Sequence, residues 1–175
     1  MRSLEVRDLG RLDWFEANRI QQETVARQKE GVGQDTLLLV EHPHVVTMGR
    51  NGSEANLLAS PEILAKTGIA YYETNRGGDV TYHGPGQIVG YPIFDLRLWK
   101  RDGVAYVRAV EEVLIRVLAS YGIVAGREPG MRGVWTGGAK VAAIGIHISR
   151  WITSHGFALN QEPDLEYFRY IVPCG

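Results

Sequence analysis

The chain has few features of a secreted, membrane-spanning or nucleic-acid-binding protein. It contains a single cysteine, which excludes an internal disulfide framework and is typical of a reducing compartment. Its net charge is −1, with 19 Lys and Arg against 20 Asp and Glu, so no overall charge attracts nucleic acid or an anionic membrane. The apolar stretch 88–94 is far too short to cross a bilayer. Because residues 1–12 also lack the apolar core of a secretory signal, we expect a cytosolic (cytoplasmic) protein.

The length and composition fit one domain. A typical domain has roughly 100–150 residues, and this chain has 175, of which 45% are apolar. The sequence contains no internal repeat, low-complexity tract or linker. We therefore expect a single domain over 1–175.

Strand patterns outnumber helical patterns along the chain. The clearest helix covers 104–121, where apolar residues recur at helical spacing before Gly122, and another follows a capping Asp13 up to residue 29. Short helices are expected at 62–66 and 163–170, and strands at 6–9, 36–41, 45–48, 69–74, 87–96, 134–136, 141–149 and 154–159. We expect the last three strands to be joined by glycine-containing turns. Because strands and helices do not alternate regularly, we predict an α/β fold of the α+β type, built on a mixed sheet.

The glycine-rich segment 76–86 is the first candidate for ligand binding. Its two adjacent glycines, Gly77 and Gly78, allow the backbone to approach a ligand closely, and Arg76 and His83 add polar side chains on either side. A decorated hairpin turn would have the same composition, so the segment alone leaves both interpretations open. It does not contain the G-x-x-x-x-G-K-[ST] pattern of a phosphate-binding loop.

Lys140 and Cys174 are candidates for proton transfer and nucleophilic attack. Lys140 begins an apolar strand-like run, where burial would favour its neutral, basic form, although an edge-strand lysine that points to water is the commoner case. Cys174 lies between Pro173 and Gly175, where a sharp turn would present the thiol. A nucleophilic cysteine needs a cationic neighbour, and the candidates here are Lys140 and two of the histidines, His83 and His155. Free cysteines are more often buried and inert.

The histidines show no spacing that indicates a metal site. His42 and His44 lie two residues apart, but neither Cys-x-x-Cys nor His-Glu-x-x-His accompanies them, and we expect no metal. His42 is expected to end a strand near a pocket. His155 follows Ser154 and precedes a glycine in a strand, where it is expected to line a cavity, whereas His147 is expected to point to solvent.

Six segments carry a resemblance to a known family. In chain order they are 41–43 (EHP), 76–93 (RGGDVTYHGPGQIVGYPI), 133–135 (GVW), 140–146 (KVAAIGI), 155–160 (HGFALN) and 171–175 (IVPCG). Together they resemble the octanoyltransferases of lipoate synthesis, also called lipoyl(octanoyl) transferases, from about residue 37 to the last residue. The glycine-rich block combined with Pro-Cys-Gly is highly specific for that family.

The resemblance implies a fold, a reaction and a set of site residues. The fold is that of the biotin and lipoate protein ligases, with a mixed sheet and flanking helices. The reaction moves octanoyl from the phosphopantetheine of acyl carrier protein to a lysine on the lipoyl domain of a 2-oxoacid dehydrogenase E2 subunit or the glycine cleavage H protein, without ATP or metal. Cys174 matches the acyl-thioester cysteine and Lys140 its partner. The matching substrate-binding residues are Arg76, Gly77, Gly78, Asp79, Val80, Thr81, Tyr82, His83, Ala143, Ile144, Gly145, Gly156, Phe157 and Ala158.

These implied roles lead to further expectations. We expect the side chains of Lys140 and Cys174 to hydrogen-bond directly or through one water, and apolar residues around Tyr91, Ile144 and Phe157 to form an acyl tunnel. Members of the family usually continue a few dozen residues past Pro-Cys-Gly, so either a C-terminal tail after residue 175 is missing from this sequence or the protein is truncated. Two rivals remain: an ATP-dependent lipoate or biotin protein ligase, and a non-catalytic protein that binds acyl carrier protein or lipoyl domains.

Overall fold

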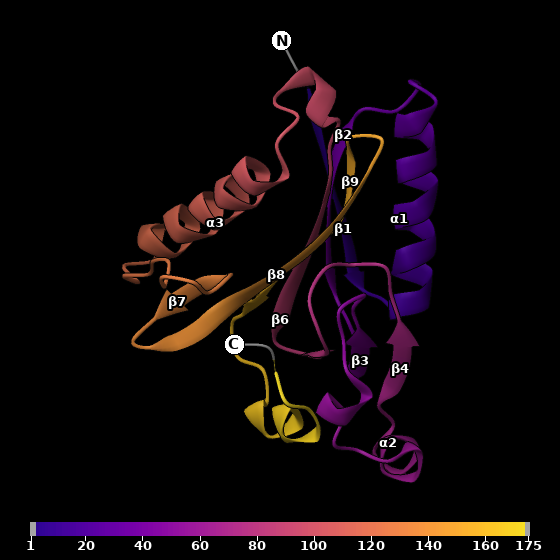
Figure 1. Cartoon of the computed structure of the whole chain (residues 1–175), viewed down its shortest axis with the longest axis vertical. Helices are drawn as coiled ribbons and strands as arrows, with labels where there is room; N and C mark the ends of the chain where they lie inside the picture. The colour runs from indigo at the N-terminus through magenta and orange to yellow at the C-terminus, as the bar shows by residue number, and fades with distance from the viewer. Residues whose placement is uncertain (1–2, 174–175) are drawn as a thin grey trace.

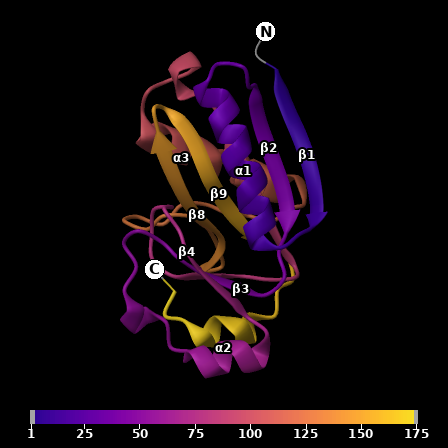
Figure 2. The same cartoon turned by 90° about the vertical axis from the view of Figure 1, so that its right-hand side faces the viewer.

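The computed structural model describes residues 3–173, which form a large curved sheet, a small sheet at one end of it, and helices on both faces (Figures 1 and 2). The large sheet contains, in spatial order, β1 (Leu4–Arg11), β2 (Asp35–Glu41), β6 (Gln87–Ile93), β9 (Ile152–Asn160), β8 (Ala139–Ser149) and β7 (Val134–Thr136). β1 is parallel to β2, and the other neighbours are antiparallel. The small sheet has the order β4 (Ala70–Glu73), β3 (Val45–Met48) and β5 (Thr81–His83). The prediction of a mixed sheet with flanking helices is confirmed.

Two long helices cover opposite faces of the large sheet, as Figure 1 shows. α1 (Trp14–Lys29) begins where the Asp13 side chain accepts a hydrogen bond from the Phe15 N–H, at 2.8 Å. α3 (Gly103–Ser120) begins in the same way at Asp102, which accepts from the Ala105 N–H at 2.9 Å. These caps satisfy N–H groups that have no partner within a helix. The short helices are α2 (Pro61–Thr67), η1 (Glu54–Asn56), η2 (Leu96–Leu98) and η3 (Leu165–Tyr170).

Alternation along the central strands divides the core into two layers. On β6, Val89, Tyr91 and Ile93 face α1, and they pack there with Leu38 of β2. The α3 face instead contacts Phe157 and Leu159 of β9. A third core holds the small sheet against η3 and α2. No helix within residues 3–173 is long and apolar enough to span a membrane.

The short helix expected at 163–170 is present as the 3-10 helix η3. One local expectation was wrong. The turn between β8 and β9 contains no glycine, because Arg150 and Trp151 themselves adopt left-handed conformations, with φ of 53° and 65°. Two consecutive residues at positive φ form the turn that matches the twist of a two-residue hairpin, and here ordinary side chains accept that strain. The turn between β7 and β8 does use glycines, Gly137 and Gly138.

Candidate active site

Residues 76–80 of the glycine-rich segment lie against strand β8 of the large sheet. The Gly77 N–H donates to the Ile146 carbonyl at 2.8 Å, while the Arg50 N–H donates to the Arg76 carbonyl at 2.9 Å. Gly145 on β8 permits this approach, since a Cβ there would lie 2.8 Å from the Gly77 oxygen. Because Gly145 also pairs with Gly156 of β9, the three segments that were predicted to bind substrate meet at one place.

Arg76 places a buried positive charge at this meeting point. Its side chain is 8% exposed, and one terminal nitrogen donates to the Thr47 carbonyl at 2.6 Å and to the Thr47 hydroxyl at 3.0 Å. The other terminal nitrogen donates to the Gly77 carbonyl at 3.2 Å. Arg76 therefore ties the glycine-rich segment to β3, in addition to any contact it makes with substrate.

The buried His83 and His155 lie near this charge and the buried His42 lies beside His83, and the hydrogen bonds of all three fix their tautomers. The Nδ1–H of His83 donates to the Gln87 side-chain oxygen at 3.1 Å, and the Nε2–H of His155 donates to the Asn75 side-chain oxygen at 2.6 Å. His42 donates from Nδ1 to the Leu12 carbonyl at 2.8 Å. Its Nε2 therefore accepts, at 2.8 Å, from the hydroxyl of Tyr91 on β6.

Burial keeps two of these histidines neutral. Burial, the nearby His42 and the Arg76 charge together lower the pKa of His83 from 6.5 to about 3. Burial and Arg76 lower the pKa of His155 to about 3 as well. Neither ring carries a positive charge near neutral pH, so neither supplies the cation that a Cys174 thiolate needs. Of the three cationic candidates from the sequence, Lys140 therefore remains as the candidate.

Acidification is expected to destabilise the fold through His83 and His155. Since both pKa values fall on folding, the unfolded chain binds more protons between about pH 6.5 and pH 3. Stability is therefore full above pH 6.5 and declines below it, by roughly 2 kcal/mol per histidine between pH 7.5 and 5. Urea unfolding at the two pH values measures the loss. His155→Gln, which keeps a donor for Asn75, should show about half the loss, and an unchanged loss in this variant would contradict the assignment.

Lys140 stands at the edge of the large sheet, in the β7–β8 hairpin. Its Nζ lies 5.1 Å from the centroid of the Trp135 ring, and the two residues are paired across the strands. Gly133 packs beside the same side chain, because a Cβ there would lie 3.5 Å from the Lys140 Cδ. The Glu111 carboxylate of α3 accepts a hydrogen bond from the Gly133 N–H at 3.3 Å. Residues 133–135 thus pack against the side chain of the half-buried Lys140.

Cys174 lies outside the described residues, so the expected hydrogen bond between it and Lys140 stays a prediction. The residues that precede it are anchored by stacked rings. Tyr167 of η3 stacks on His44 at 4.0 Å and on Tyr82 at 5.3 Å, and His44 Nδ1 hydrogen-bonds the Tyr82 hydroxyl at 2.7 Å. Ile171 is buried, with 3% exposure. The chain is therefore held in place up to a point three residues before the cysteine.

Not every residue of the predicted substrate-binding set faces a site. Val80 and Tyr82 are buried in the core of the small sheet, and Ala158 is buried under α1. His155 reaches the α1 face only because it adopts a left-handed conformation, with φ of 55°. His147, which was expected to point to solvent, is only partly exposed.

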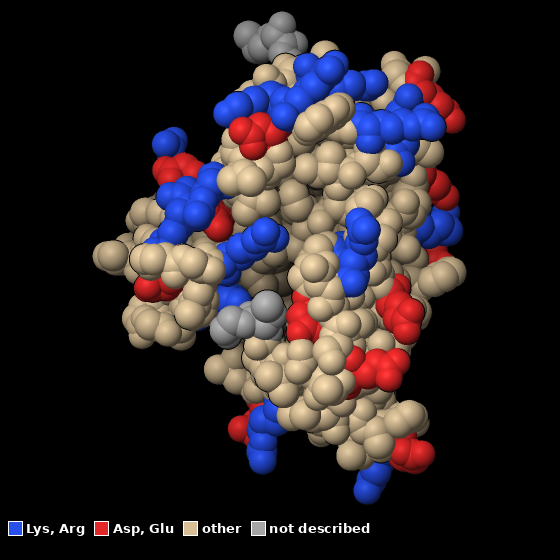
Figure 3. Space-filling view, in the orientation of Figure 1, with Lys and Arg blue, Asp and Glu red and all other residues tan. Residues whose placement is uncertain are grey.

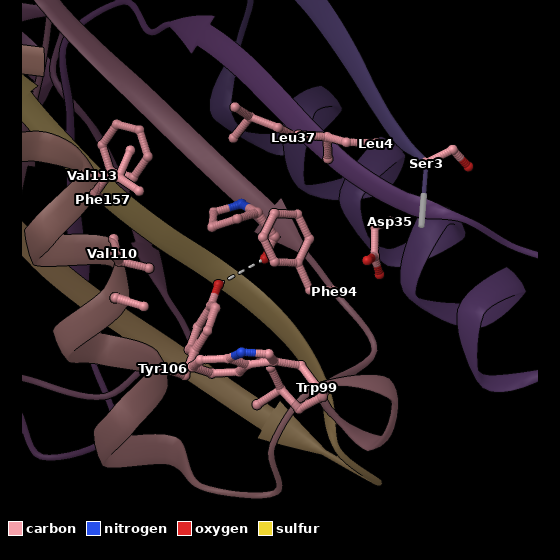
Figure 4. Close-up of a pocket in the computed structure, with 13 residues that line it drawn as sticks. Ser3, Leu4, Asp35, Leu37, Phe94, Trp99, Tyr106, Val110, Val113 and Phe157 are labelled. Carbon is pink, nitrogen blue, oxygen red and sulfur yellow. Dashed lines mark hydrogen bonds between the residues drawn. The ribbon is translucent and has the colours of Figure 1, made fainter. Parts of the chain in front are cut away.

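The predicted acyl tunnel around Tyr91, Ile144 and Phe157 is wrong as a single cavity. Tyr91 packs under α1, whereas Ile144 and Phe157 pack on the α3 side of the sheet. The structure instead contains an apolar cavity of about 440 Å³ between α3 and the sheet (Figure 4). Phe157 contributes to its wall, and the Tyr106 hydroxyl donates to the Pro92 carbonyl beside it at 3.2 Å. None of the three buried histidines lines this cavity.

Figure 3 shows a hollow near the centre of this face of the molecule, with Lys and Arg side chains along its rim over α3 and the β7–β8 hairpin.

Within residues 3–173 no group of three or more His, Cys, Asp or Glu side chains is arranged to hold a metal ion.

Sequence reasoning missed several polar residues that shape the site. Thr47 and Gln87 bind Arg76 and His83, and Asn75 binds His155. Glu111 is 1% exposed and pairs with Arg108 and Arg127 at 2.8 and 2.9 Å. A carboxylate on the apolar face of the helix 104–121 was the signal available for Glu111. Thr47 and Asn75 gave no such signal.

Comparisons with known proteins give matches over nearly the whole chain. Residues 13–175 match the family model described as the lipoyl protein ligase A/B catalytic domain. An octanoyltransferase of Solibacter usitatus is 62% identical over 175 residues, which cover 100% of this chain and 80% of that protein. One of Koribacter versatilis is 56% identical over 177 residues, covering 98% and 70%.

Solved structures share the fold at low identity. A bi-partite lipoate protein ligase of Thermoplasma acidophilum, studied with its E2 lipoyl domain, superposes with a TM-score of 0.81 at 16% identity, covering 99% of this chain and 68% of that one. A lipoate-protein ligase A bound with ATP has a TM-score of 0.78 at 15% identity, covering 98% and 71%.

Proposed function

Because the chain belongs to the lipoyl protein ligase A/B catalytic domain family and its curated relatives are octanoyltransferases, we propose that it transfers octanoyl from acyl carrier protein to lipoyl domains. It is an acyltransferase of lipoate biosynthesis. The observation that carries this proposal is the 62% identity to an octanoyltransferase over the whole chain. The meeting of segments 76–78, 143–145 and 156–158 at one point of the structure supports it.

The reaction has two half-reactions that share one acyl-enzyme. In the first, the Cys174 thiolate attacks the carbonyl carbon of the octanoyl thioester, and the phosphopantetheine thiolate leaves and takes a proton. This exchange of one thioester for another is nearly isoenergetic, so it depends on positioning and on stabilising the oxyanion. In the second, a neutral lysine amine of the lipoyl domain attacks the Cys174 thioester, an amide forms, and the thiol is restored. This order is ping-pong.

Lys140 is the group that we assign to the proton. As a cation it stabilises the Cys174 thiolate and then gives its proton to the leaving phosphopantetheine thiolate; the neutral amine that results accepts a proton from the attacking lysine, which restores the starting charges. The neutral state of His83 and His155 supports this division, since neither contributes a positive charge. Packing against Trp135 and Gly133 restricts the positions that the Lys140 ammonium can reach.

The lipoyl domain is the acceptor that the family relationship favours. The ligase from Thermoplasma acidophilum was studied with its E2 lipoyl domain, and the fold is the same. For the present chain we propose the lipoyl domains of 2-oxoacid dehydrogenase E2 subunits and the glycine cleavage H protein. The donor is the octanoyl thioester on acyl carrier protein, and the cycle needs no ATP and no metal.

The test is intact-protein mass spectrometry after the enzyme is mixed with octanoyl-acyl carrier protein, with Cys174→Ser alongside. We expect an octanoyl adduct that hydroxylamine removes, present on the wild type and absent from the variant. Transfer that occurs only after octanoate and ATP are added would place the chain with the ligases. Binding of a lipoyl domain without an adduct or transfer under either condition would make it a binding protein.

A further inference from the structure

The carboxylate of Asp79, in the Arg-Gly-Gly-Asp motif, is directed into the protein. One of its oxygens accepts from the Ser53 N–H at 3.1 Å and from the Val80 N–H at 2.7 Å. The other accepts a hydrogen bond from the side-chain amide of Asn56. These contacts occupy both oxygens of a half-buried carboxylate.

Asn56 also hydrogen-bonds the segment that precedes Cys174 in the sequence. Its carbonyl accepts from the Val172 N–H at 2.7 Å, and the next residue, Leu57, forms an antiparallel bridge with Ile171. The Tyr170 carbonyl accepts from two N–H groups of the same loop, at 2.9 and 3.2 Å. The loop that contains η1 and the segment 170–172 are therefore paired backbone to backbone. Val172 precedes Cys174 by two residues in the sequence.

The Asp79–Asn56 pair is suited to hold this pairing in one geometry. The loop 53–57 contains only the three-residue 3-10 helix η1, whose own N-cap residue makes no side-chain hydrogen bond, so the Asp79 contacts add to the packing and the backbone bonds that hold it. The Asp79 carboxylate fixes both ends of η1, through the Ser53 N–H and the Asn56 amide. Hydrogen bonds to a charged group are the stronger class. The glycine-rich segment contacts β8 through Gly77, and through Asp79 and Asn56 it is also connected to the backbone of Val172.

We propose that Asp79 and Asn56 are positioning residues that connect the glycine-rich segment to the backbone of Val172 and thereby place the Cys174 thiol. The inference rests on the proposed function for its catalytic meaning, since Cys174 is the nucleophile there. It differs from the role that the family resemblance gives Asp79, which is contact with substrate. It also gives a role to Asn56, which lies outside all six motif segments.

A charge-swap cycle tests the proposal. Asn56→Asp places two carboxylates together, which removes the donor and adds repulsion, whereas Asp79→Asn places two amides together, which can still hydrogen-bond if the Asn56 amide turns over. The double variant restores one amide and one carboxylate, and the amide oxygen introduced at position 79 still accepts from the Ser53 and Val80 N–H groups. We expect iodoacetamide to react with Cys174 of Asn56→Asp roughly 10-fold more slowly near neutral pH, with a pH profile shifted to higher pH, because a displaced thiol loses the cation that favours its thiolate. Asp79→Asn should show a smaller loss, and the double variant should recover most of the rate.

The matched control is Gln28→Glu, far from the site. The Gln28 amide donates to the Asp35 carboxylate at 3.3 Å, so this change also places two carboxylates together. It is expected to lower stability and leave the alkylation rate and its pH profile as in the wild type. If Asn56→Asp does not fold, Asn56→Ala removes the amide without adding a charge and gives the same comparison.

The outcomes separate this proposal from the proposed function. Alkylation needs no octanoyl donor, so the cycle remains readable even if octanoyl transfer fails. Single variants that react at the wild-type rate would overturn the positioning role. A folded double variant that stays as slow as the singles would also overturn it, because the amide–carboxylate contact would then not be the cause. Recovery by the double variant would support it.

Discussion

Replacing Lys140 with methionine is expected to slow octanoyl transfer by about 10²- to 10⁴-fold, which is the usual range for loss of a positioned acid–base group. Methionine has nearly the same length and keeps the contact with the Trp135 ring and with Gly133. The fold should therefore remain, and unfolding by urea should change little. The loss is chemical, since the Cys174 thiolate loses its cation and the attacking amine loses its base.

Lys140→Arg separates these two roles. Arginine keeps a positive charge but cannot give up its proton in a protein, so it can stabilise a thiolate and cannot act as a base. We expect alkylation of Cys174 near the wild-type rate and formation of the octanoyl adduct, followed by slow transfer to the lipoyl domain. Single-turnover measurements of adduct formation and adduct decay report the two half-reactions separately.

Lys66→Met is the control for the loss of one lysine charge. Lys66 is exposed in the last turn of α2, remote from the β7–β8 hairpin, and its replacement should leave both half-reactions unchanged. Transfer by Lys140→Met at more than about a tenth of the wild-type rate would contradict the role given to this lysine, because a positioned base contributes more than that.

Much of the fold could be predicted because local signals and tertiary packing agree in it. Asp13 and Ser60 precede α1 and α2 and cap them, and Gly122 follows α3 in a left-handed conformation. The alternation of β2 was hidden in a continuous apolar run, yet only one of its faces, with Leu38 and Val40, is buried in the core under α1, while the other face is partly exposed. The turn at Arg150 and Trp151 could not be predicted, because nothing in those residue types indicates positive φ.

The candidate site could be predicted only in part. The resemblance named Gly77 and Gly145 as substrate-binding residues, and the structure places them against each other, where a Cβ at Gly145 would lie 2.8 Å from the Gly77 oxygen. The sequence did not show that Asp79 points inward, nor that Asn56 receives it from 23 residues away. Those contacts depend on the pairing of distant segments, which a pattern along one chain does not contain. The tunnel failed for the same reason, because the faces of β6 and β9 are assigned only once their register is known.

The approach of β9 to β6 leads to a second large effect, on stability. A Cβ at Gly156 would lie 2.1 Å from the Gly90 carbonyl oxygen and 2.5 Å from the Pro92 Cδ. Both obstacles belong to β6, whose backbone is paired with β9 at Gly90 and Phe157. Neither can move without separating hydrogen-bonded strands. Gly156→Ala is therefore expected to lower the free energy of unfolding by about 3 kcal/mol or more.

Gly126→Ala is the matched control for this prediction. A Cβ at Gly126 meets no atom within 4 Å, and the residue is outside the left-handed region. Its stability should stay within about 0.5 kcal/mol of the wild type. Urea unfolding of the three proteins measures both effects. Equal stability of Gly156→Ala and wild type would show that β6 and β9 can move apart at this point with little cost in free energy. A large loss would mean that the family motif keeps this glycine for the contact between two strands, whether or not substrate touches it.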